Sequence, residues 1–385
     1  MGGIIRVERI DDGAAVRVWL GEGEPVRFHA IWLRDNAFDP ETRAAGNGQK
    51  LLTIADIPEE TAIAEAAVDP AGDLEIVFHP DGKRCAFPAH WLAGHVYDRA
   101  LPCEPGWIDP SRRLWTGDLG SNRPDILYSE AVANRRALGA WLADFRAHGF
   151  ATMRDGPVEA GAIERVAALF GYIRETNYGR WFDVRTEVAP TNLAYTGLGL
   201  QAHTDNPYRD PVPTIQILYC LENSVAGGES AVVDGFMAAR RLRDDHPDDF
   251  DLLSRHCARF EYSGASGVDL RARRPVIELA PDGELRAIRF NNRSSSALLD
   301  VPYDEVPGYY AAYRRFAAII DDPAMAVTFR LEPGACFLVD NTRVLHARTA
   351  FSSTGARWLQ GCYADMDGLL STLSVLEAET REAAE

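Results

Sequence analysis

Apolar and polar residues alternate along three segments near the start of the chain. These segments are 4–10, 14–20 and 73–79. An alternation of period two is typical of strands that bury one face and expose the other. The pattern therefore predicts a small antiparallel β domain at this end of the chain.

Two kinds of periodicity are interleaved in the rest of the chain. Helical spacing of apolar residues appears in four segments: 129–147, 159–172, 236–256 and 307–320. Gly149 stands where the first of these helices is expected to end. Short strand-like runs lie among them: 214–220, 230–234, 276–279, 286–290, 327–331, 335–340 and 358–363. Many short strands with flanking helices favour a mainly β fold, a jelly-roll barrel that helices brace from outside.

The length of the chain, 385 residues, exceeds the usual range of a single domain. We place the boundary in Pro102–Gly106, where proline and glycine are frequent. The expected organisation is a small N-terminal β-rich domain over 1–105 and a larger catalytic domain over 106–385. The acidic segment 377–385 is expected to be a frayed tail.

Charge and apolar content limit the classes of partner. The formal net charge is −17, and basic residues are not clustered, which argues against a nucleic-acid partner. No segment has the pattern of a secretory leader, and no apolar run approaches the roughly 18 residues of a membrane helix. The six cysteines are scattered, without CxxC pairing. We expect a cytoplasmic protein that acts on a small molecule and has no membrane partner.

The most informative chemistry lies in His203, Asp205 and His346. Residues i and i+2 of a strand share one face, so His203 and Asp205 can approach the same ion. His346 follows the strand-like run 335–340, which can carry it to the same place. Two histidines and one carboxylate can occupy one face of an octahedral Fe(II) and leave three positions open. The three residues therefore predict an iron site for oxidative chemistry.

Seven motifs extend this interpretation over nearly the whole chain. They are Trp32–Asn36, Ala194–Thr196, His203–Asp205, Gly227–Ser230, Val233–Phe236, Asp340–His346 and Gly361–Asp365. In this order they resemble the γ-butyrobetaine and trimethyllysine hydroxylases, which belong to the Fe(II)/2-oxoglutarate dioxygenase superfamily that includes taurine dioxygenase. The resemblance implies a double-stranded β-helix (jelly-roll) domain with His203, Asp205 and His346 on Fe(II). It also implies 2-oxoglutarate and O2 as cosubstrates.

The resemblance assigns residues to the cosubstrate. Arg357 matches the arginine that pairs with the far carboxylate of 2-oxoglutarate, and a guanidinium offers a planar charged fork to such a group. Arg343 and Arg348 lie nearby in the sequence and are alternatives. Ser230 follows two glycines and is expected to add a hydroxyl to the same site.

An aromatic cage for a trimethylammonium group is also implied. The matching positions are Tyr178, Phe182, Tyr195 and Tyr363, with Trp181 as an alternative wall beside Phe182. A quaternary ammonium has no N–H to donate, so aromatic faces suit it through cation–π attraction and burial of its methyl groups. For any one aromatic residue taken alone, a place in the core is the simpler interpretation.

The opposite end of the substrate is expected to be an anion. Asn192 and Asn291 match positions that bind the substrate carboxylate. Arg293 and Asn206 depart from the γ-butyrobetaine enzymes, which usually carry apolar residues there. An added cation and amide favour 2-trimethylaminoethylphosphonate, hydroxylated at the carbon next to phosphorus. The alternatives are γ-butyrobetaine, which would give L-carnitine, and an Arg293 that points to solvent or pairs with an acid.

Three further expectations complete the interpretation. In relatives the Trp32–Asn36 motif is followed by zinc-binding cysteines, but residues 37–41 contain no cysteine, so we expect no structural zinc. Packing around Phe28, Trp32 and Phe38 must therefore stabilise this domain. The resemblance suggests a homodimer. Two other classes of protein are alternatives. A metal hydrolase would need a general base near zinc and has no use for an aromatic cage. A non-enzymatic betaine-binding barrel would keep the cage but need not keep the three metal ligands.

Overall fold

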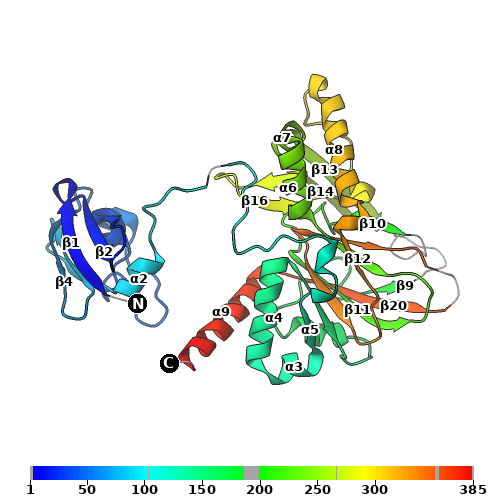
Figure 1. Ribbon diagram of the computed structural model, residues 1–385, viewed down its shortest axis with the longest axis horizontal. Helices are drawn as coiled ribbons and strands as arrows, with labels where there is room; N and C mark the ends of the chain where they lie inside the picture. The colour runs from blue at the N-terminus through cyan, green and yellow to red at the C-terminus, as the bar shows by residue number, and fades with distance from the viewer. Residues whose placement is uncertain (1–2, 103, 186–198, 266, 352–354, 384–385) are drawn as a thin grey trace. The chain divides into compact units, whose positions relative to one another are not determined.

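The computed structural model describes residues 3–102, 104–185, 199–265, 267–351 and 355–383 (Figure 1). The chain divides into two compact units, Met1–Leu101 and Pro102–Glu385. The division falls a few residues before the boundary at 105 that the sequence suggested. Each unit has its own apolar core, so each is described by itself.

The N-terminal unit contains two small antiparallel sheets and two short helices. The strands and helices are β1 (Ile4–Ile10), β2 (Ala15–Leu20), β3 (Val26–His29), α1 (Ala30–Asp35), β4 (Ala62–Val68), β5 (Leu74–His79), β6 (Arg84–Phe87) and α2 (Ala89–Gly94). Alternate residues of β5 are buried, as the alternation in the sequence predicts. Phe28 is fully buried, and its ring lies 5.4 Å from that of Trp32. Aromatic packing of this kind stabilises the unit.

Two sheets form the centre of the C-terminal unit. The six-stranded sheet has the order β7 (Asp125–Leu127), β8 (Phe150–Arg154), β18 (Cys336–Asp340), β11 (Ile215–Asn223), β20 (Arg357–Ala364) and β9 (Phe182–Arg185). The four-stranded sheet has the order β10 (Leu200–His203), β19 (Val344–Arg348), β12 (Ser230–Asp234) and β17 (Ala326–Phe329). Val232 and Val327 of the smaller sheet share one buried cluster with Phe337 and Leu359 of the larger. The pair is a jelly roll that does not close into a barrel.

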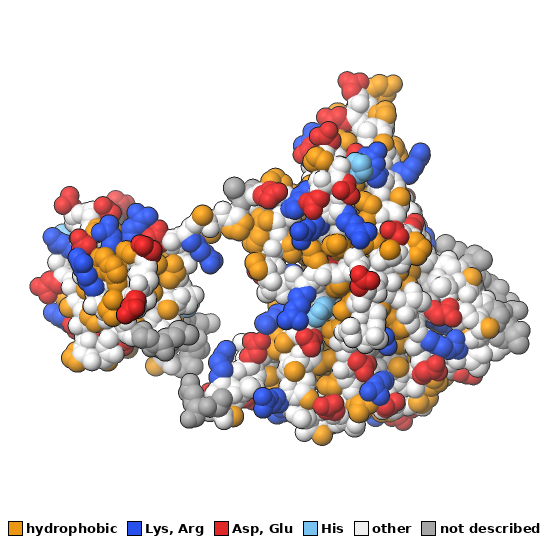
Figure 2. Space-filling model, viewed as in Figure 1, with side chains coloured by type: hydrophobic (Ala, Val, Ile, Leu, Met, Phe, Trp, Pro, Cys, Tyr) orange, Lys and Arg blue, Asp and Glu red, His pale blue; other side chains and the backbone are white. Residues whose placement is uncertain are grey.

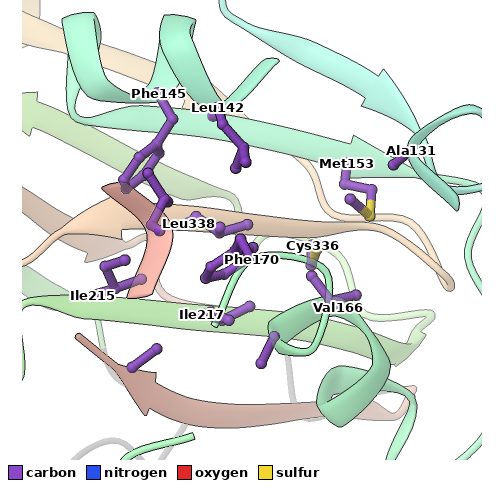
Figure 3. Packing of buried hydrophobic residues seen from close by; sticks show 14 of the residues in the cluster. Ala131, Leu142, Phe145, Met153, Val166, Phe170, Ile215, Ile217, Cys336 and Leu338 are labelled. Atoms are coloured by element: carbon purple, nitrogen blue, oxygen red, sulfur yellow. The ribbon is translucent and has the colours of Figure 1, made fainter. Parts of the chain in front are cut away.

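Helices cover the outer face of the six-stranded sheet (Figure 1). They are α3 (Tyr128–Ala133), α4 (Arg135–His148), α5 (Ala162–Ala167) and α9 (Met366–Glu382). Figure 3 shows Ile215 and Ile217 of β11 within the cluster that also holds Leu142 and Phe145 of α4. Because side chains of a strand alternate between faces, the intervening Gln216 points to the other side, toward the smaller sheet.

A second helical layer packs against the four-stranded sheet. It contains α6 (Gly235–Asp245), α7 (Pro247–Arg255) and α8 (Val306–Ile320), together with the ribbons β13 (Cys257–Ala265), β14 (Val268–Pro275), β15 (Ile277–Leu279) and β16 (Leu285–Ile288). Leu345 of β19 and Val233 of β12 share a buried cluster with Leu242 of α6 and Phe316 of α8. Both sheets are thus covered on their outer faces, and the space between them remains for a site.

The structure corrects four of the predicted elements. Of the helix expected over 159–172, only the short α5 (Ala162–Ala167) forms. The helix expected over 129–147 is interrupted at Asn134, whose side-chain Oδ1 accepts from Ala137 N at 3.1 Å and caps a new helix. The helix expected over 236–256 is interrupted at His246, before a proline at the first position of α7. The expectation of a frayed tail from 377 is wrong, because α9 continues to Glu382.

The described surface carries both signs of charge. On the face in view in Figure 2, Lys and Arg side chains lie among Asp and Glu side chains. Exposed pairs such as Arg255–Asp251 are part of this pattern. Among the residues that the structure describes, no helix has the length and apolar character needed to cross a membrane.

A fully buried ion pair joins the elements around β12 and β19. Arg343 donates from Nε to Asp234 Oδ1 at 3.0 Å and from Nη2 to Oδ2 at 2.8 Å, and neither side chain is exposed. Arg343 also donates to the carbonyl oxygens of Ala147, at the end of α4, and Arg113. Trp115 N and Phe236 N donate to the Asp234 carboxylate. One guanidinium and one carboxylate thereby satisfy four backbone groups from three other segments: the end of α4, the loop at 113–115 and the start of α6.

Replacing Arg343 by methionine is expected to destabilise the protein by about 3–5 kcal/mol, because the Asp234 carboxylate would stay buried without its cation. Urea unfolding at neutral pH measures this change. In the double variant Arg343→Met/Asp234→Asn, the uncompensated charge is removed and part of the loss is expected to return. Arg135→Met, at an exposed pair with Glu379, is the control and is expected to change little. Wild-type stability of Arg343→Met would contradict the role given to this pair.

Candidate active site

His203, Asp205 and His346 meet between the two sheets. Their ligand atoms all lie within 4.8 Å of one another. Asp205 Oδ1 is 3.4 Å from His203 Nε2 and 3.9 Å from His346 Nε2. These distances bring two imidazole nitrogens and one carboxylate oxygen to a common point, as the sequence predicted.

Strand pairing accounts for this meeting. His203 at the end of β10 is directly opposite His346 in β19, and the two ring centroids are 4.3 Å apart. Asp205 follows β10, where its backbone is held by Asn341: Asp205 N donates to Asn341 Oδ1 at 2.7 Å, and Asn341 Nδ2 donates to Asp205 O at 2.9 Å. These two hydrogen bonds between the Asp205 backbone and the Asn341 side chain fix the position from which the Asp205 side chain extends.

The protonation states suit a metal. His203 Nδ1 lies 2.7 Å from Gln201 O, which can only accept, so Nδ1 carries a proton and Nε2 is the nitrogen that faces Asp205. Burial, together with the neighbouring His203, lowers the pKa of His346 to about 3, so the His346 ring is neutral. Burial alone would raise the pKa of Asp205, but its contacts with His203 and His346 and the charge of Arg293 hold that pKa well below the ordinary value. At neutral pH the site therefore offers a neutral His346 imidazole and an ionised Asp205 carboxylate to a metal.

The residues fit the iron that the sequence implies. His203 Nε2, His346 Nε2 and Asp205 Oδ1 would hold it, because this donor set is the facial arrangement of two histidines and one carboxylate used for non-haem Fe(II). His203 also has the backbone partner that commonly orients a metal-binding imidazole.

The second oxygen of Asp205 has partners that sequence analysis missed or assigned differently. Gln216 Nε2 donates to Asp205 Oδ2 at 2.6 Å, and Tyr363 Oη donates to the same oxygen at 2.9 Å. Burial and the Asp205 charge raise the pKa of Tyr363 well above its ordinary value, so the phenol keeps its proton. Nothing in the sequence singled out Gln216, because one polar residue in a strand is common.

A cavity of about 100 Å³ adjoins the three residues. Arg357 and Ser230, the two residues expected at the cosubstrate, both line it. Burial lowers the pKa of Arg357 to about 10, which leaves the guanidinium charged at neutral pH. Of the two alternative arginines, Arg348 lines the same cavity, whereas Arg343 is committed to Asp234. A dianion bound here would therefore meet more than one guanidinium.

Aromatic side chains form another part of the cavity wall. Tyr178, Phe182 and Tyr363 line it, and the Phe182 ring lies 5.6 Å from Tyr178 and 5.5 Å from Tyr363. Tyr208, which the sequence analysis did not consider, also lines the cavity, and its Oη is 2.9 Å from Tyr178 Oη. Trp181 instead packs against the buried apolar cluster between the six-stranded sheet and the helices α4, α5 and α9. Tyr195 lies outside the described residues.

Of the residues expected around a substrate anion, Arg293 lines the cavity. Arg293 is exposed to solvent and also lines the cavity, and its charge acts on both Asp205 and His346. Asn192 lies outside the described residues.

Two asparagines expected at the same anion are engaged with other groups. Asn291 is not among the residues that line the cavity: its Oδ1 accepts from Arg293 N and Ser294 N, and its Nδ2 donates to Thr204 O. Asn206 does not line the cavity either, and its Oδ1 accepts from Arg209 Nε at 3.4 Å. Asn291 therefore secures the turn that carries Arg293.

Comparison with known proteins agrees with this geometry. Residues 112–363 match the family model described as taurine catabolism dioxygenase TauD, TfdA family. The chain is 35% identical over 365 residues to the γ-butyrobetaine dioxygenase of Pseudomonas sp. (strain AK-1), with 94% of each chain covered. It is 30% identical over 379 residues to the trimethyllysine dioxygenase of Meyerozyma guilliermondii, covering 95% of this chain and 94% of that protein.

A human protein is similar along the same length. The γ-butyrobetaine dioxygenase of Homo sapiens is 26% identical over 380 residues, with 97% of each chain covered. The family match, the extent of these alignments and the clustered His203, Asp205 and His346 lead to one assignment. The chain belongs to the TauD, TfdA family of Fe(II)/2-oxoglutarate-dependent dioxygenases, in the group with the γ-butyrobetaine and trimethyllysine dioxygenases.

Proposed function

We propose that this enzyme hydroxylates a small trimethylammonium zwitterion and that γ-butyrobetaine is the first candidate substrate. The observation that carries the proposal is the aromatic wall of Tyr178, Phe182 and Tyr363 in the same cavity as the three metal-binding residues. The identity of 35% to a γ-butyrobetaine dioxygenase along 94% of both chains supports the choice of substrate. Hydroxylation of this compound would give L-carnitine.

The chemistry divides between the bound metal and the side chains. When bound, Fe(II) supplies the oxygen chemistry of the family, in which O2 oxidises 2-oxoglutarate to succinate and CO2 and one oxygen atom enters a substrate C–H bond. Arg357 receives the far carboxylate of 2-oxoglutarate, and Ser230 adds a hydroxyl from the start of β12. These contacts fix the cosubstrate before the substrate enters.

The aromatic side chains orient the substrate. A trimethylammonium group placed against the rings of Tyr178 and Phe182 gains cation–π attraction and loses little hydration, because it has no N–H donors. The hydrogen bond between Tyr178 Oη and Tyr208 Oη holds the first of these rings. The distance between this end and the anion end then determines which carbon lies nearest the metal.

A second candidate is 2-trimethylaminoethylphosphonate. The observation that favours it is that Arg293 lines the cavity, where the family resemblance leads one to expect an apolar residue. A phosphonate carries more negative charge than a carboxylate and offers three oxygens to a guanidinium. In that case the carbon bearing phosphorus would be hydroxylated.

Succinate release with each candidate distinguishes the two. With Fe(II), 2-oxoglutarate and O2, the enzyme is expected to release succinate in step with γ-butyrobetaine hydroxylation. Arg293→Met is expected to leave that reaction within about threefold and to reduce turnover of the phosphonate by about tenfold or more, the size of one lost charged hydrogen bond. Arg271→Met, on the exposed part of β14, is the matched control. No succinate coupling with any trimethylammonium compound would contradict the proposed function.

The cation–π contribution has its own test. Tyr178→Leu is expected to raise KM for γ-butyrobetaine about tenfold, because a ring facing a desolvated cation contributes about 1–2 kcal/mol. KM for the carbon isostere 5,5-dimethylhexanoate, whose tert-butyl head group is uncharged, is expected to change much less, because only the positive charge of the head group is missing from that compound. Tyr172→Leu, at an exposed tyrosine, is the control. Equal effects on both compounds would show that Tyr178 contributes shape and not attraction to the cation.

A further inference from the structure

The two oxygens of the Asp205 carboxylate have different surroundings. Oδ1 faces the two imidazole nitrogens, at 3.4 and 3.9 Å. Oδ2 accepts two hydrogen bonds on its own, from Gln216 Nε2 at 2.6 Å and from Tyr363 Oη at 2.9 Å. The carboxylate therefore has one oxygen directed to the metal position and one oxygen held by protein donors.

The two donors come from the opposite sheet. Gln216 of β11 and Tyr363 of β20 are directly paired across neighbouring strands, so their side chains stand on the same face. His203 and His346 belong to β10 and β19 of the smaller sheet, and Asp205 follows β10. A cross-strand pair in one sheet thus fixes a carboxylate that the other sheet supplies.

A glutamine at position 216 lowers the stability of the fold. Its side chain is buried, and among the described residues its Oε1 has no hydrogen-bond partner. An unsatisfied buried acceptor of this kind costs about 1–3 kcal/mol. The inward-facing neighbours on β11 include Leu218, and an apolar side chain at 216 would avoid the cost. The amide nitrogen must face Asp205, because the amide oxygen there would repel the carboxylate.

This arrangement matters because of the number of coordination positions that stay open on the metal. An octahedral ion held by two imidazoles and one carboxylate oxygen keeps three free positions. The family's reaction needs all three, since 2-oxoglutarate chelates through two oxygens and O2 requires one more. A carboxylate that bound through both oxygens would occupy one of them.

We propose that Gln216 and Tyr363 are positioning residues that keep Asp205 a one-oxygen ligand of the metal. By holding Oδ2, they prevent the carboxylate from turning to offer both oxygens. The proposal concerns metal ligation alone and holds for any substrate, so its failure and the failure of the substrate assignment are distinguishable.

The test counts the water molecules bound to Mn(II) in the protein without cosubstrate, from the broadening of the Mn(II) electron paramagnetic resonance signal in ¹⁷O-labelled water. Wild type is expected to hold three waters, and the double variant Gln216→Met/Tyr363→Phe is expected to hold two. Tyr363→Phe removes a single oxygen atom and is expected to give a count between these values. Three waters in the double variant would overturn the proposal.

Metal affinity and stability provide the controls. Each single variant is expected to bind Mn(II) about 10- to 100-fold more weakly, the usual effect of removing a group that orients a metal ligand. The thermal unfolding midpoint of metal-free Gln216→Met is expected to stay close to that of wild type, because the unsatisfied Oε1 acceptor disappears with the donor and Tyr363 still donates to Asp205 Oδ2. Gln360→Met replaces a buried glutamine of β20 whose amide donates to Asp183, and it is expected to leave Mn(II) affinity unchanged. Equal loss of affinity in Gln360→Met would overturn the specific role of Gln216.

Discussion

The structure of the site depends on a carboxylate shared between two sheets. Asp205 is fixed through its backbone by Asn341, directs Oδ1 toward the two imidazoles and gives Oδ2 to donors of the opposite sheet. None of these contacts is strong enough alone to define an octahedral site. Together they place three donor atoms within 4.8 Å before any metal arrives. On this preorganisation we base the proposal that Asp205 stays a one-oxygen ligand and leaves metal positions open for the cosubstrates.

Charge in the cavity follows from the same arrangement. Three guanidinium groups, those of Arg293, Arg348 and Arg357, line it, and among the described lining residues Asp205 supplies the one carboxylate. Burial and repulsion between the guanidinium groups lower the pKa of Arg348 to about 10, and burial lowers that of Arg357 to about 10, so both of these side chains remain cations at neutral pH. This balance favours the entry of anions such as 2-oxoglutarate, although the whole chain has a formal charge of −17. The charged side chains among the described lining residues are thus mostly positive, whereas the net charge of the protein is negative.

The sequence predicted His203, Asp205 and His346 as candidate metal ligands, and it predicted strands such as β11, β12 and β18 from their apolar spacing. The strands β10 and β19 that carry the two histidines were not among the predicted runs, because their pairing depends on a long-range contact. The role of Gln216 depends on which strand lies across the fold from Asp205, and no local pattern carries that information. Asn291 shows the opposite limit of sequence analysis. Its family position suggested a substrate contact, whereas its side chain caps the turn that carries Arg293. Helix ends set by side-chain caps, such as Asn134, were missed for the same reason.

The most direct test of the account is an anaerobic crystal structure with Fe(II) and 2-oxoglutarate, recorded at the iron absorption edge. We expect a single iron bound by His203 Nε2, His346 Nε2 and one oxygen of Asp205, with the far carboxylate of 2-oxoglutarate on Arg357. An iron bound elsewhere, or bound without one of these three side chains, would contradict the central claim.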